Sequence, residues 1–463
     1  MRRGATGGAP APWRCEGCWI RRGRTCNLGL IEEPDDLDIS SDSERLLVHS
    51  LFRFPAKFHP PVAQALIRNF SEPGDLVLDP FCGSGTLLAE AARMRRRSIG
   101  TDVDPVAVSV SSAKTGLLVE SELLEAASSL LAALDEIAPP QEIYESRKFE
   151  DISQESLKEN LDRESLWVPD IPNLDHWFRR YVTLDLARIY RCVIDLQCSS
   201  AIKSYLLVVF ASVIRNASNA DPVPVSGLEV TAHMKRLDAA GRVVNPYFLF
   251  RKAMGKAVAA SKEYGEQVSP YFEPRIWEAD ATSLDLDSEM CDLVITSPPY
   301  HNAVDYYRRH QLEMFWLRHT RSQKERLDLL PKYIGRHRIP RKTPILATDE
   351  KLPALAAHWE SEMAQASIQR AVDFRHYALS MRNVFRRLSQ AVKIGGKVVL
   401  VVGRSSWNGD RIPTDDLFVE LASENFSSVR LMSYPVKNRY MSYARRNSAS
   451  IDREYVLVLQ RKI

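Results

Sequence analysis

The pattern of apolar and polar residues is clearest between Leu46 and Arg97. It predicts a helix at Val62–Phe70, a turn at Glu72–Asp75 and a strand at Leu76–Asp79. A glycine-containing turn at Pro80–Gly85, a second helix from Thr86 to about Arg95 and a second strand at Ser98–Thr101 follow. Both strands are short apolar runs of the kind that lie buried in a parallel sheet. This succession of strand, glycine turn, helix and strand is half of a doubly wound nucleotide-binding sheet.

The pattern changes after residue 118 and changes back near residue 270. Leu123–Ile137 and Leu184–Ile214 have helical periodicity, with few strand signals between them. Beyond residue 270, five strands are predicted at Arg275–Glu278, Asp292–Thr296, Lys397–Val402, Ser428–Ser433 and Tyr455–Leu459. One long helix is predicted near Ala371–Leu388. We therefore predict one α/β domain, formed by residues 45–118 and 270–463, that is interrupted by a mostly helical insertion at residues 119–269.

The amino-terminal stretch has a different composition. Residues 1 to about 36 are rich in glycine, alanine, proline and arginine and show no periodicity. We therefore expect residues 1–44 to form a disordered or loosely attached extension. Cys15, Cys18 and Cys26 lie in this stretch, but a fourth ligand at matching spacing is missing, so no metal site is predicted.

Composition narrows the class of protein. Of 463 residues, 45% are apolar and 26% are charged, the usual mixture for a soluble globular protein. Seven cysteines cannot form a disulfide framework in a chain of this length, which favours a reducing cytoplasm. The longest uncharged apolar run, Ser204–Ile214, is shorter than the roughly 18–20 residues that span a bilayer, and no secretory signal is recognisable. Membrane, secreted and fibrous classes are excluded, and a cytoplasmic protein is expected.

A net charge of +3 conceals a strongly uneven distribution. Glu120–Glu164 holds thirteen acidic and four basic residues, so it carries a net charge of −9. Arg318–Lys342 holds nine basic and two acidic residues, and Val213–Lys262 holds eight and three, giving net charges of +7 and +5. Either basic segment could follow a phosphate backbone, although such runs are also common on ordinary solvated surfaces.

Two motifs carry candidate chemistry, and the first is Asp79–Thr86, with the sequence DPFCGSGT. It follows a predicted strand and opens a helix, so its glycines permit close approach of a ligand and its free N–H groups can face an anion. Asp102 ends the following strand, seventeen residues after Gly85, where a carboxylate can accept hydrogen bonds from ribose hydroxyls. No GKS or GKT sequence follows the glycines, so the turn is not a P-loop.

The second motif is Thr296–Tyr300, with the sequence TSPPY, directly after the strand Asp292–Thr296. Two consecutive prolines cannot continue a strand, so the chain must leave the sheet there. Ser297 and Tyr300 are therefore expected at the carboxyl edge of the sheet, where open α/β folds bind their ligands. Taken alone, the motif is also compatible with a surface turn, but both motifs fall at the same edge.

These two motifs together resemble those of the DNA amino-methyltransferases, which methylate cytosine N4 or adenine N6 and usually belong to restriction-modification systems. Phe54–Pro60 is similar to the family segment that packs against the methionine end of the cofactor, and Asp280 resembles the position that holds the adenine ring. The resemblance covers roughly residues 45–118 and 270–463. It implies a class I S-adenosylmethionine-dependent methyltransferase fold, a Rossmann-like seven-stranded doubly wound sheet, carrying a mostly helical insertion.

The resemblance also implies site residues. The cofactor, S-adenosylmethionine, would be held by Phe54, Pro55, Lys57, Asp79, Pro80, Phe81, Cys82, Gly83, Ser84, Gly85, Thr86, Asp102 and Asp280. The catalytic residues would be Ser297, Pro298, Pro299 and Tyr300. No metal is expected.

The chemistry implied by the resemblance agrees with these residue types. An exocyclic amino nitrogen is a poor nucleophile because its lone pair is delocalised into the ring. The Ser297 hydroxyl and the Pro298 carbonyl could accept its two hydrogens and aim the lone pair at the methyl group, so that the transfer depends on positioning. The target base would leave the duplex and stack on Tyr300.

The identity of the base is left open between two amino groups. Serine in the first position of the motif occurs in the family mostly with cytosine N4, so a site-specific cytosine-N4 enzyme acting on double-stranded DNA is favoured and adenine N6 is the alternative. An RNA amino-methyltransferase and a non-catalytic DNA-binding regulator are further alternatives. A cognate restriction endonuclease acting on the same site would be a possible partner.

The residues that contact DNA are sought in the basic segments. Glu120–Glu164 would be repelled by phosphate, whereas Val213–Lys262 and Arg318–Lys342 are both candidates. We favour the second because it follows the TSPPY motif closely and contains residues suited to phosphate contacts or guanine reading. Its expected DNA-binding residues are Arg318, Arg321, Lys332, Arg336, Arg338, Arg341 and Lys342.

Overall fold

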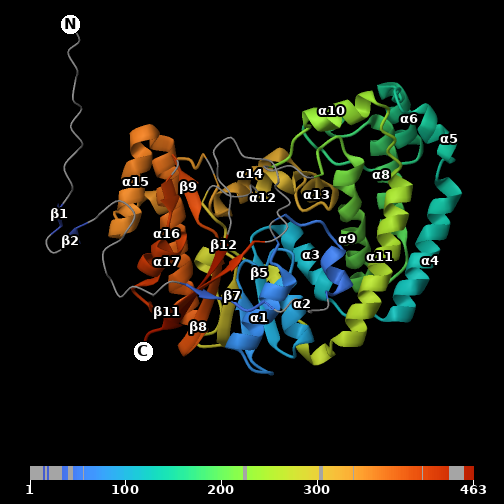
Figure 1. Ribbon diagram of the computed structural model, residues 1–463. Helices are drawn as coiled ribbons and strands as arrows, with labels where there is room; N and C mark the ends of the chain where they lie inside the picture. Colours follow the sequence, from blue (N-terminus) through green and yellow to red (C-terminus); the bar gives the residue numbers. More distant parts are fainter. Residues whose placement is uncertain are drawn as a thin grey trace, which may run out of the picture.

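The computed structural model describes residues 34–39, 45–55, 57–222, 227–301, 306–336, 338–408, 410–436 and 453–463, together with two short paired strands, β1 (Arg14–Cys15) and β2 (Cys18–Trp19). Cys26 lies outside the described residues. An eight-stranded sheet with helices on both faces forms one part of the protein, and a body of helices lies beside it (Figure 1).

The strand order in the large sheet is β3-β11-β12-β8-β7-β4-β5-β6. The strands are β3 (Asp35–Asp36), β4 (Leu76–Asp79), β5 (Arg97–Asp102), β6 (Arg275–Glu278), β7 (Cys291–Thr296), β8 (Val392–Val402), β11 (Phe426–Pro435) and β12 (Arg453–Arg461). Strands β4 to β8 are mutually parallel, and β12 runs antiparallel to both β8 and β11. The carboxyl ends of β4, β5 and β7 therefore meet at one edge of the sheet, as predicted for the two motifs. A small separate hairpin pairs β9 (Ser405–Trp407) with β10 (Asp410–Ile412).

The eighth strand corrects the expectation of a loose extension up to residue 44. Asp35 and Asp36 pair in parallel with β11 at the sheet edge, and the following residue, Leu37, is buried. Arg430 and Arg453 form ion pairs with the two carboxylates. Two acids have no hydrophobic pattern to mark them as a strand, and the arginines that pair with them lie 395 and 417 residues away in the chain.

Helices cover both faces of the sheet, so the parallel strands are apolar on both sides. Helices α1 and α2 pack on the face that includes Val77, whereas α15, α16 and α17 pack on the face that includes Leu76 and Leu78. The bounds of these helices are α1 (Pro60–Phe70), α2 (Thr86–Arg93), α15 (Ala354–Ala366), α16 (Ile368–Ala391) and α17 (Thr414–Ala422). The alternation of neighbouring residues between two cores matches the two-residue period of a strand.

Residues between β5 and β6 form only helices and connecting segments in the part that the structure describes. They are α3 (Pro105–Thr115), α4 (Glu120–Ile137), α5 (Gln141–Ser146), α6 (Gln154–Arg163), α7 (Leu174–Trp177), α8 (Arg180–Asp195), α9 (Ser200–Ala217), α10 (Ala232–Ala239), α11 (Pro246–Gln267) and the 3-10 helix η2 (Pro270–Phe272). The predicted continuous helix Leu184–Ile214 is two helices, because the Ser199 hydroxyl caps α9 by accepting a hydrogen bond from the Ile202 N–H.

The remaining short elements are η1 (Leu47–Ser50), η3 (Ala281–Ser283), α12 (Tyr306–Arg309), α13 (Gln311–Trp316), α14 (Gln323–Leu329), η4 (Leu330–Lys332) and η5 (Pro344–Ala347). Among the described helices, α9 alone is long and apolar enough to cross a membrane by length and composition, and 61% of it is buried inside the protein. It packs against α8, α11 and α13 as a core helix.

The helical body shares its core with the segment that follows the TSPPY motif. Trp316, the last residue of α13, is fully buried there. Its indole ring makes edge contacts with Trp167, Phe178 and Phe210, at centroid distances of 6.0, 6.2 and 5.7 Å. Aromatic pairs in this geometry contribute beyond the area that they bury, so α13 is anchored in the insertion.

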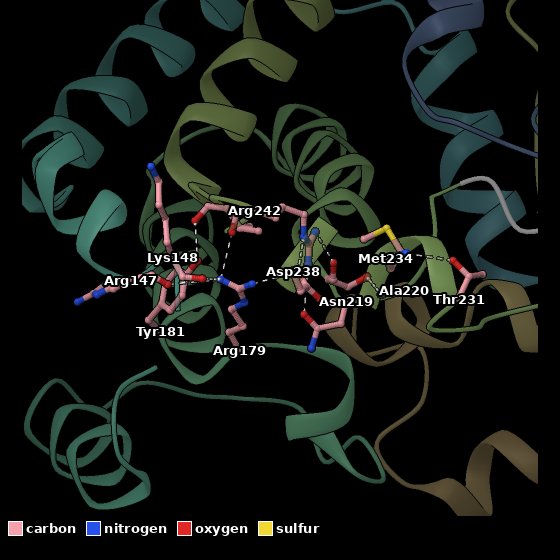
Figure 2. A network of polar contacts seen from close by, with 12 residues as sticks. Arg147, Lys148, Arg179, Tyr181, Asn219, Ala220, Thr231, Met234, Asp238 and Arg242 are labelled. Carbon is pink, nitrogen blue, oxygen red and sulfur yellow. Dashed lines mark hydrogen bonds and ion pairs between the residues drawn. The ribbon is translucent and has the colours of Figure 1, made fainter. Parts of the chain in front are cut away.

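Two arginines, Arg179 and Arg242, connect segments of the insertion through hydrogen bonds and ion pairs (Figure 2). Arg179 donates hydrogen bonds to the carbonyl oxygens of Arg147, Lys148 and Arg242 and forms an ion pair with Asp238 at 3.0 Å. Arg242 pairs with the same carboxylate at 2.7 Å. This network ties α10 to the segments before α6 and after α9, so Arg242 of the basic segment Val213–Lys262 has a structural role.

Candidate functional site

The glycine turn lies between β4 and α2, as predicted. Gly83 and Gly85 have φ angles of +49° and +67°, in the left-handed region that favours glycine. A Cβ atom on Gly85 would lie 2.7 Å from Cβ of Ser111 on α3, and one on Gly83 would lie 3.3 Å from the Phe54 ring. Glycines are therefore needed both for the backbone path and for the close packing of α3 and Phe54 around the turn.

Asp102 closes the turn from the neighbouring strand. Its carboxylate accepts hydrogen bonds from the N–H groups of Gly83 and Asp104, both at 2.9 Å. Burial, reinforced by the nearby Asp104, raises the pKa of Asp102 to about 7. The side chain is half-buried rather than enclosed, so it reaches the sheet edge where a ligand hydroxyl could approach.

Asp79 links the two motifs directly. Its carboxylate accepts a hydrogen bond of 2.7 Å from the hydroxyl of Thr296, the residue before Ser297, and one of 3.2 Å from the Phe81 N–H. Asp79 is only 2% exposed, and burial raises its pKa to about 7. This bond holds the end of β7 against the start of the glycine turn, so the spacing between the two motifs is fixed inside the protein.

The TSPPY segment leaves the sheet at Ser297 and turns over the edge. Burial raises the pKa of Tyr300 well above its ordinary value, and the neighbouring Ser297 side chain opposes that rise. Tyr377 on α16 donates a hydrogen bond of 3.2 Å to the Pro299 carbonyl. Pro298 is buried and Ser297 is half-buried, so the turn is held from below while the serine can meet a ligand.

Phe54 forms an aromatic wall beside the glycine turn. Its ring stacks on Tyr306 at 5.8 Å and lies 4.8 Å from the imidazole of His310. His310 is itself held by a hydrogen bond of 2.7 Å to the Asp104 carboxylate, and both side chains are buried. The segment after the TSPPY motif thus contacts the cofactor-binding candidates through Phe54.

The other residues expected around the cofactor have mainly supporting contacts. Lys57 donates a hydrogen bond of 2.8 Å to the His49 carbonyl, and Cys82 is buried with its sulfur 3.7 Å from the Ser111 hydroxyl. Asp280 caps η3 by accepting hydrogen bonds from the N–H and hydroxyl of Thr282, so its carboxylate is engaged locally. Contact of these side chains with a cofactor stays a prediction.

Two residues near the turn were missed by the sequence analysis. Tyr333 is 7% exposed, and its hydroxyl has no hydrogen-bond partner among the described residues. Its pKa is raised well above the ordinary value by burial and then by the charges of Asp104, Asp102 and Glu278. Lys114 is buried under the turn, 3.3 Å from the Ser84 hydroxyl, and burial lowers its pKa to about 7. Neither belongs to a sequence motif that could have marked it.

The basic segment Arg318–Lys342 lies against the catalytic turn. Gly335 has a φ of +82°, and a Cβ atom there would lie 2.8 Å from the Tyr300 carbonyl oxygen. The Arg318 guanidinium lies over the Trp167 ring, 4.8 Å from its centroid. Arg336 is half-buried, and its charge adds to the effect of burial in lowering the pKa of His376. The predicted residues that are exposed are Arg318, Arg321, Lys332, Arg338, Arg341 and Lys342.

Comparison with known proteins agrees with this geometry. Residues 28–113 match the model of the N6/N4 methyltransferase family, described as DNA methylase. The type II methyltransferase M.MvaI of Kocuria varians is 24% identical over 283 residues, which span 58% of this chain and 58% of the length of M.MvaI. The type II methyltransferase M.BsoBI of Geobacillus stearothermophilus is 23% identical, over 85% of this chain and 81% of that protein. The chain is thus similar to DNA amino-methyltransferases, and it spans 58% of the length of M.MvaI.

The similarity to DNA methylases favours a class I methyltransferase fold with S-adenosylmethionine as the cofactor. The residues around the glycine turn fit that group. The turn presents two glycines where side chains would collide, and the buried Tyr333 hydroxyl has no hydrogen-bond partner in the described part of the chain. A ribose or purine group would supply such a partner.

Proposed function

We propose that this protein transfers a methyl group from S-adenosylmethionine to an exocyclic amino group of a base in double-stranded DNA, with cytosine N4 as the target. The observation that carries the proposal is the hydrogen bond between Asp79 and Thr296, which joins the glycine turn to the TSPPY turn at one sheet edge. A cofactor on the first turn and an amino group at Ser297 would then be adjacent, as direct transfer requires.

The residues of the catalytic turn have separable roles. S-adenosylmethionine supplies an electrophilic methyl group on sulfur. Ser297 Oγ and the Pro298 carbonyl accept the two amino hydrogens and thereby orient the nitrogen lone pair. Tyr300 stacks on the base after the base has left the duplex.

Labelled cofactor and unmethylated duplex DNA test the reaction and its target together. We expect nucleoside mass spectrometry after digestion to show labelled N4-methylcytosine. Labelled N6-methyladenine would retain the reaction but overturn the choice of base, for which Ser297 is the reason. Label in structured RNA, but not in DNA, would favour an RNA amino-methyltransferase, and no label in either would favour a non-catalytic binder.

We propose that Arg318–Lys342 faces the DNA. Gly335 contacts Tyr300, so this segment borders the catalytic turn, and Arg338, Arg341 and Lys342 are exposed. The rival segment Val213–Lys262 has fewer available charges. Its Arg215 is 8% exposed and donates to three backbone carbonyls, and its Arg242 belongs to the network in Figure 2.

Replacing Arg338 and Arg341 with alanine should weaken DNA binding and reduce the salt dependence of the association constant. Each lost phosphate contact lowers the slope of log K against log salt by about 0.9. Fluorescence anisotropy at several salt concentrations measures that slope. The matched control changes Lys235 and Arg236, two exposed residues of α10, to alanine. A slope that falls only in the control would assign DNA contact to the insertion.

The relatives named above are type II methyltransferases, so we also propose that the protein works in the cytoplasm beside a cognate restriction endonuclease. The methylated sequence would then be the site that the endonuclease cuts. Plasmid DNA from cells that express the protein should resist that endonuclease and no other.

A further inference from the structure

A buried histidine joins the segment after the catalytic turn to the start of α3. His310 lies between α12 and α13 and is 1% exposed, and Asp104, the N-cap residue of α3, is 2% exposed. Nδ1 of the imidazole lies 2.7 Å from Oδ2 of the carboxylate. The two residues are 206 positions apart in the chain, so no local pattern predicts this contact.

The hydrogen bond between these side chains has one direction. A carboxylate only accepts hydrogen bonds, so Nδ1 of His310 carries the proton and donates it to Asp104. Nε2 of the same ring is buried and has no hydrogen-bond partner among the described residues. In that part of the chain, the imidazole therefore makes a single hydrogen bond, the one to Asp104.

Three aromatic rings surround the imidazole and fix its orientation. The ring centroids of Phe54, Tyr306 and Phe52 lie 4.8, 6.2 and 6.3 Å from that of His310. The Phe52 ring is nearly perpendicular to the imidazole, at 78°. A ring packed in this way cannot turn freely, so Nδ1 stays directed at Asp104.

Asp104 in turn holds Asp102, the last residue of β5. The Asp104 N–H donates a hydrogen bond of 2.9 Å to Oδ1 of Asp102, whose Oδ2 accepts one of 2.9 Å from the Gly83 N–H. The second side-chain oxygen of Asp104 accepts a hydrogen bond of 2.9 Å from the Val106 N–H. Asp104 is therefore fixed by α3 on one side and by His310 on the other, and Asp102 is fixed by Asp104 and the glycine turn.

A second contact holds α13 against α3. The hydroxyl of Ser109 on α3 lies 2.9 Å from Nε2 of His319, three residues after the end of α13. Trp316 at the end of α13 is buried in the helical body. Because α13 has these other anchors, a substitution at His310 should leave the helix in place.

We propose that His310 is a positioning residue for the cofactor, which acts through Asp104 to hold the Asp102 carboxylate in the orientation that accepts the ribose hydroxyls of S-adenosylmethionine. The inference rests on the proposed function, of which it concerns only cofactor binding. Each Asp102 oxygen already has one backbone donor, so the lone pairs left for a ribose point in directions that these donors set. Without the Nδ1 bond, Asp104 could shift, and the ribose would meet a carboxylate that is no longer preorganised.

His310→Phe and His310→Asn separate the hydrogen bond from the packing. Phenylalanine keeps a ring among the three aromatic neighbours but has no donor, whereas Nδ2 of asparagine occupies the place of Nδ1 and can donate to Asp104. Both changes should lower the melting temperature, the first because a buried carboxylate loses a donor and the second because a buried ring is lost.

Isothermal titration calorimetry with S-adenosylhomocysteine, in the absence of DNA, measures the affinity of the full chain for the product form of the cofactor. We expect His310→Phe to bind at least about tenfold more weakly than the wild-type protein and His310→Asn to stay within about threefold of it. A purely structural role for His310 would instead make affinity follow the melting temperature.

Tyr144→Phe is the matched control for loss of a hydrogen bond to a buried carboxylate. The Tyr144 hydroxyl donates to Asp185 at 2.8 Å inside the helical body, and both residues are 0% exposed. This change should lower the melting temperature and leave the affinity for S-adenosylhomocysteine unchanged.

His310→Gln guards against a folding defect in the phenylalanine variant. Its amide reaches the place of Nε2 and cannot donate to Asp104, so we expect it to bind as weakly as His310→Phe. Equal losses of affinity in the asparagine and glutamine variants would overturn the role of His310, and so would unchanged affinity in His310→Phe. A wild-type protein that binds S-adenosylhomocysteine but transfers no label to DNA would overturn the proposed function and leave this role in place.

Discussion

Replacing Ser297 with alanine is expected to lower kcat for DNA methylation about 10²–10³-fold, the usual cost of removing one preorganised polar group that acts on the reacting atoms. The alanine cannot accept an amino hydrogen, so the nitrogen lone pair is no longer held toward the methyl group. Because Ser297 lies after the end of β7 and does not support the sheet, the KM for the cofactor should change less than about threefold.

Steady-state methylation with labelled S-adenosylmethionine measures this effect, and the melting temperature checks the fold. Thr296→Val is an informative companion, because it removes the hydroxyl bonded to Asp79 while leaving the catalytic serine in place. That change should reduce stability as well as rate, since it leaves the buried carboxylate one partner short. Unchanged turnover in Ser297→Ala would mean that the TSPPY turn does not meet the amino group.

Gly85→Ala is expected to weaken S-adenosylmethionine binding at least about 100-fold, which corresponds to about 2.7 kcal/mol. The new Cβ would lie 2.7 Å from Cβ and 3.0 Å from Cα of Ser111, so either α3 or the turn must move. Left-handed backbone at a non-glycine residue adds about 1–2 kcal/mol of destabilisation. Isothermal titration calorimetry with the cofactor and with S-adenosylhomocysteine measures the loss.

Gly74→Ala is the matched control for that experiment. Gly74 has a φ of +94°, but a Cβ atom there would meet nothing within 4 Å, and the residue lies in the turn before β4. It should lower the melting temperature slightly and leave cofactor affinity unchanged. Equal losses of affinity in the two variants would show that backbone strain, rather than collision with α3, disrupts the turn.

The parts of the fold that could be predicted from the sequence are those with strong local signals. The strands β4 and β7 are short, mainly apolar runs that end just before a proline-containing turn, and β5 follows the helix after the glycine turn. The structure confirms all three within one residue at each end. Strand β8 begins at Val392, five residues before the predicted start, because the turn residues Gly395 and Gly396 lie within it. Strand β3 could not be found, since its two acids are stabilised by arginines distant in sequence.

The candidate site divides in the same way. Gly83, Gly85, Ser297 and Tyr300 belong to contiguous motifs, and the structure brings both motifs to one sheet edge. The Gly335 turn reaches Tyr300 from a segment without a motif. Its approach is a tertiary contact that no local pattern encodes.

The burial of Trp316 among Trp167, Phe178 and Phe210 bears on whether the insertion can be exchanged between related proteins. A chimaera that exchanges the insertion for that of a relative would strip the aromatic contacts from α13, and α13 directly follows the segment that carries Tyr306 and His310 against Phe54. We therefore expect the insertion and the α12–α13 segment to evolve together, and a chimaera should fold only if both segments are taken from the same relative.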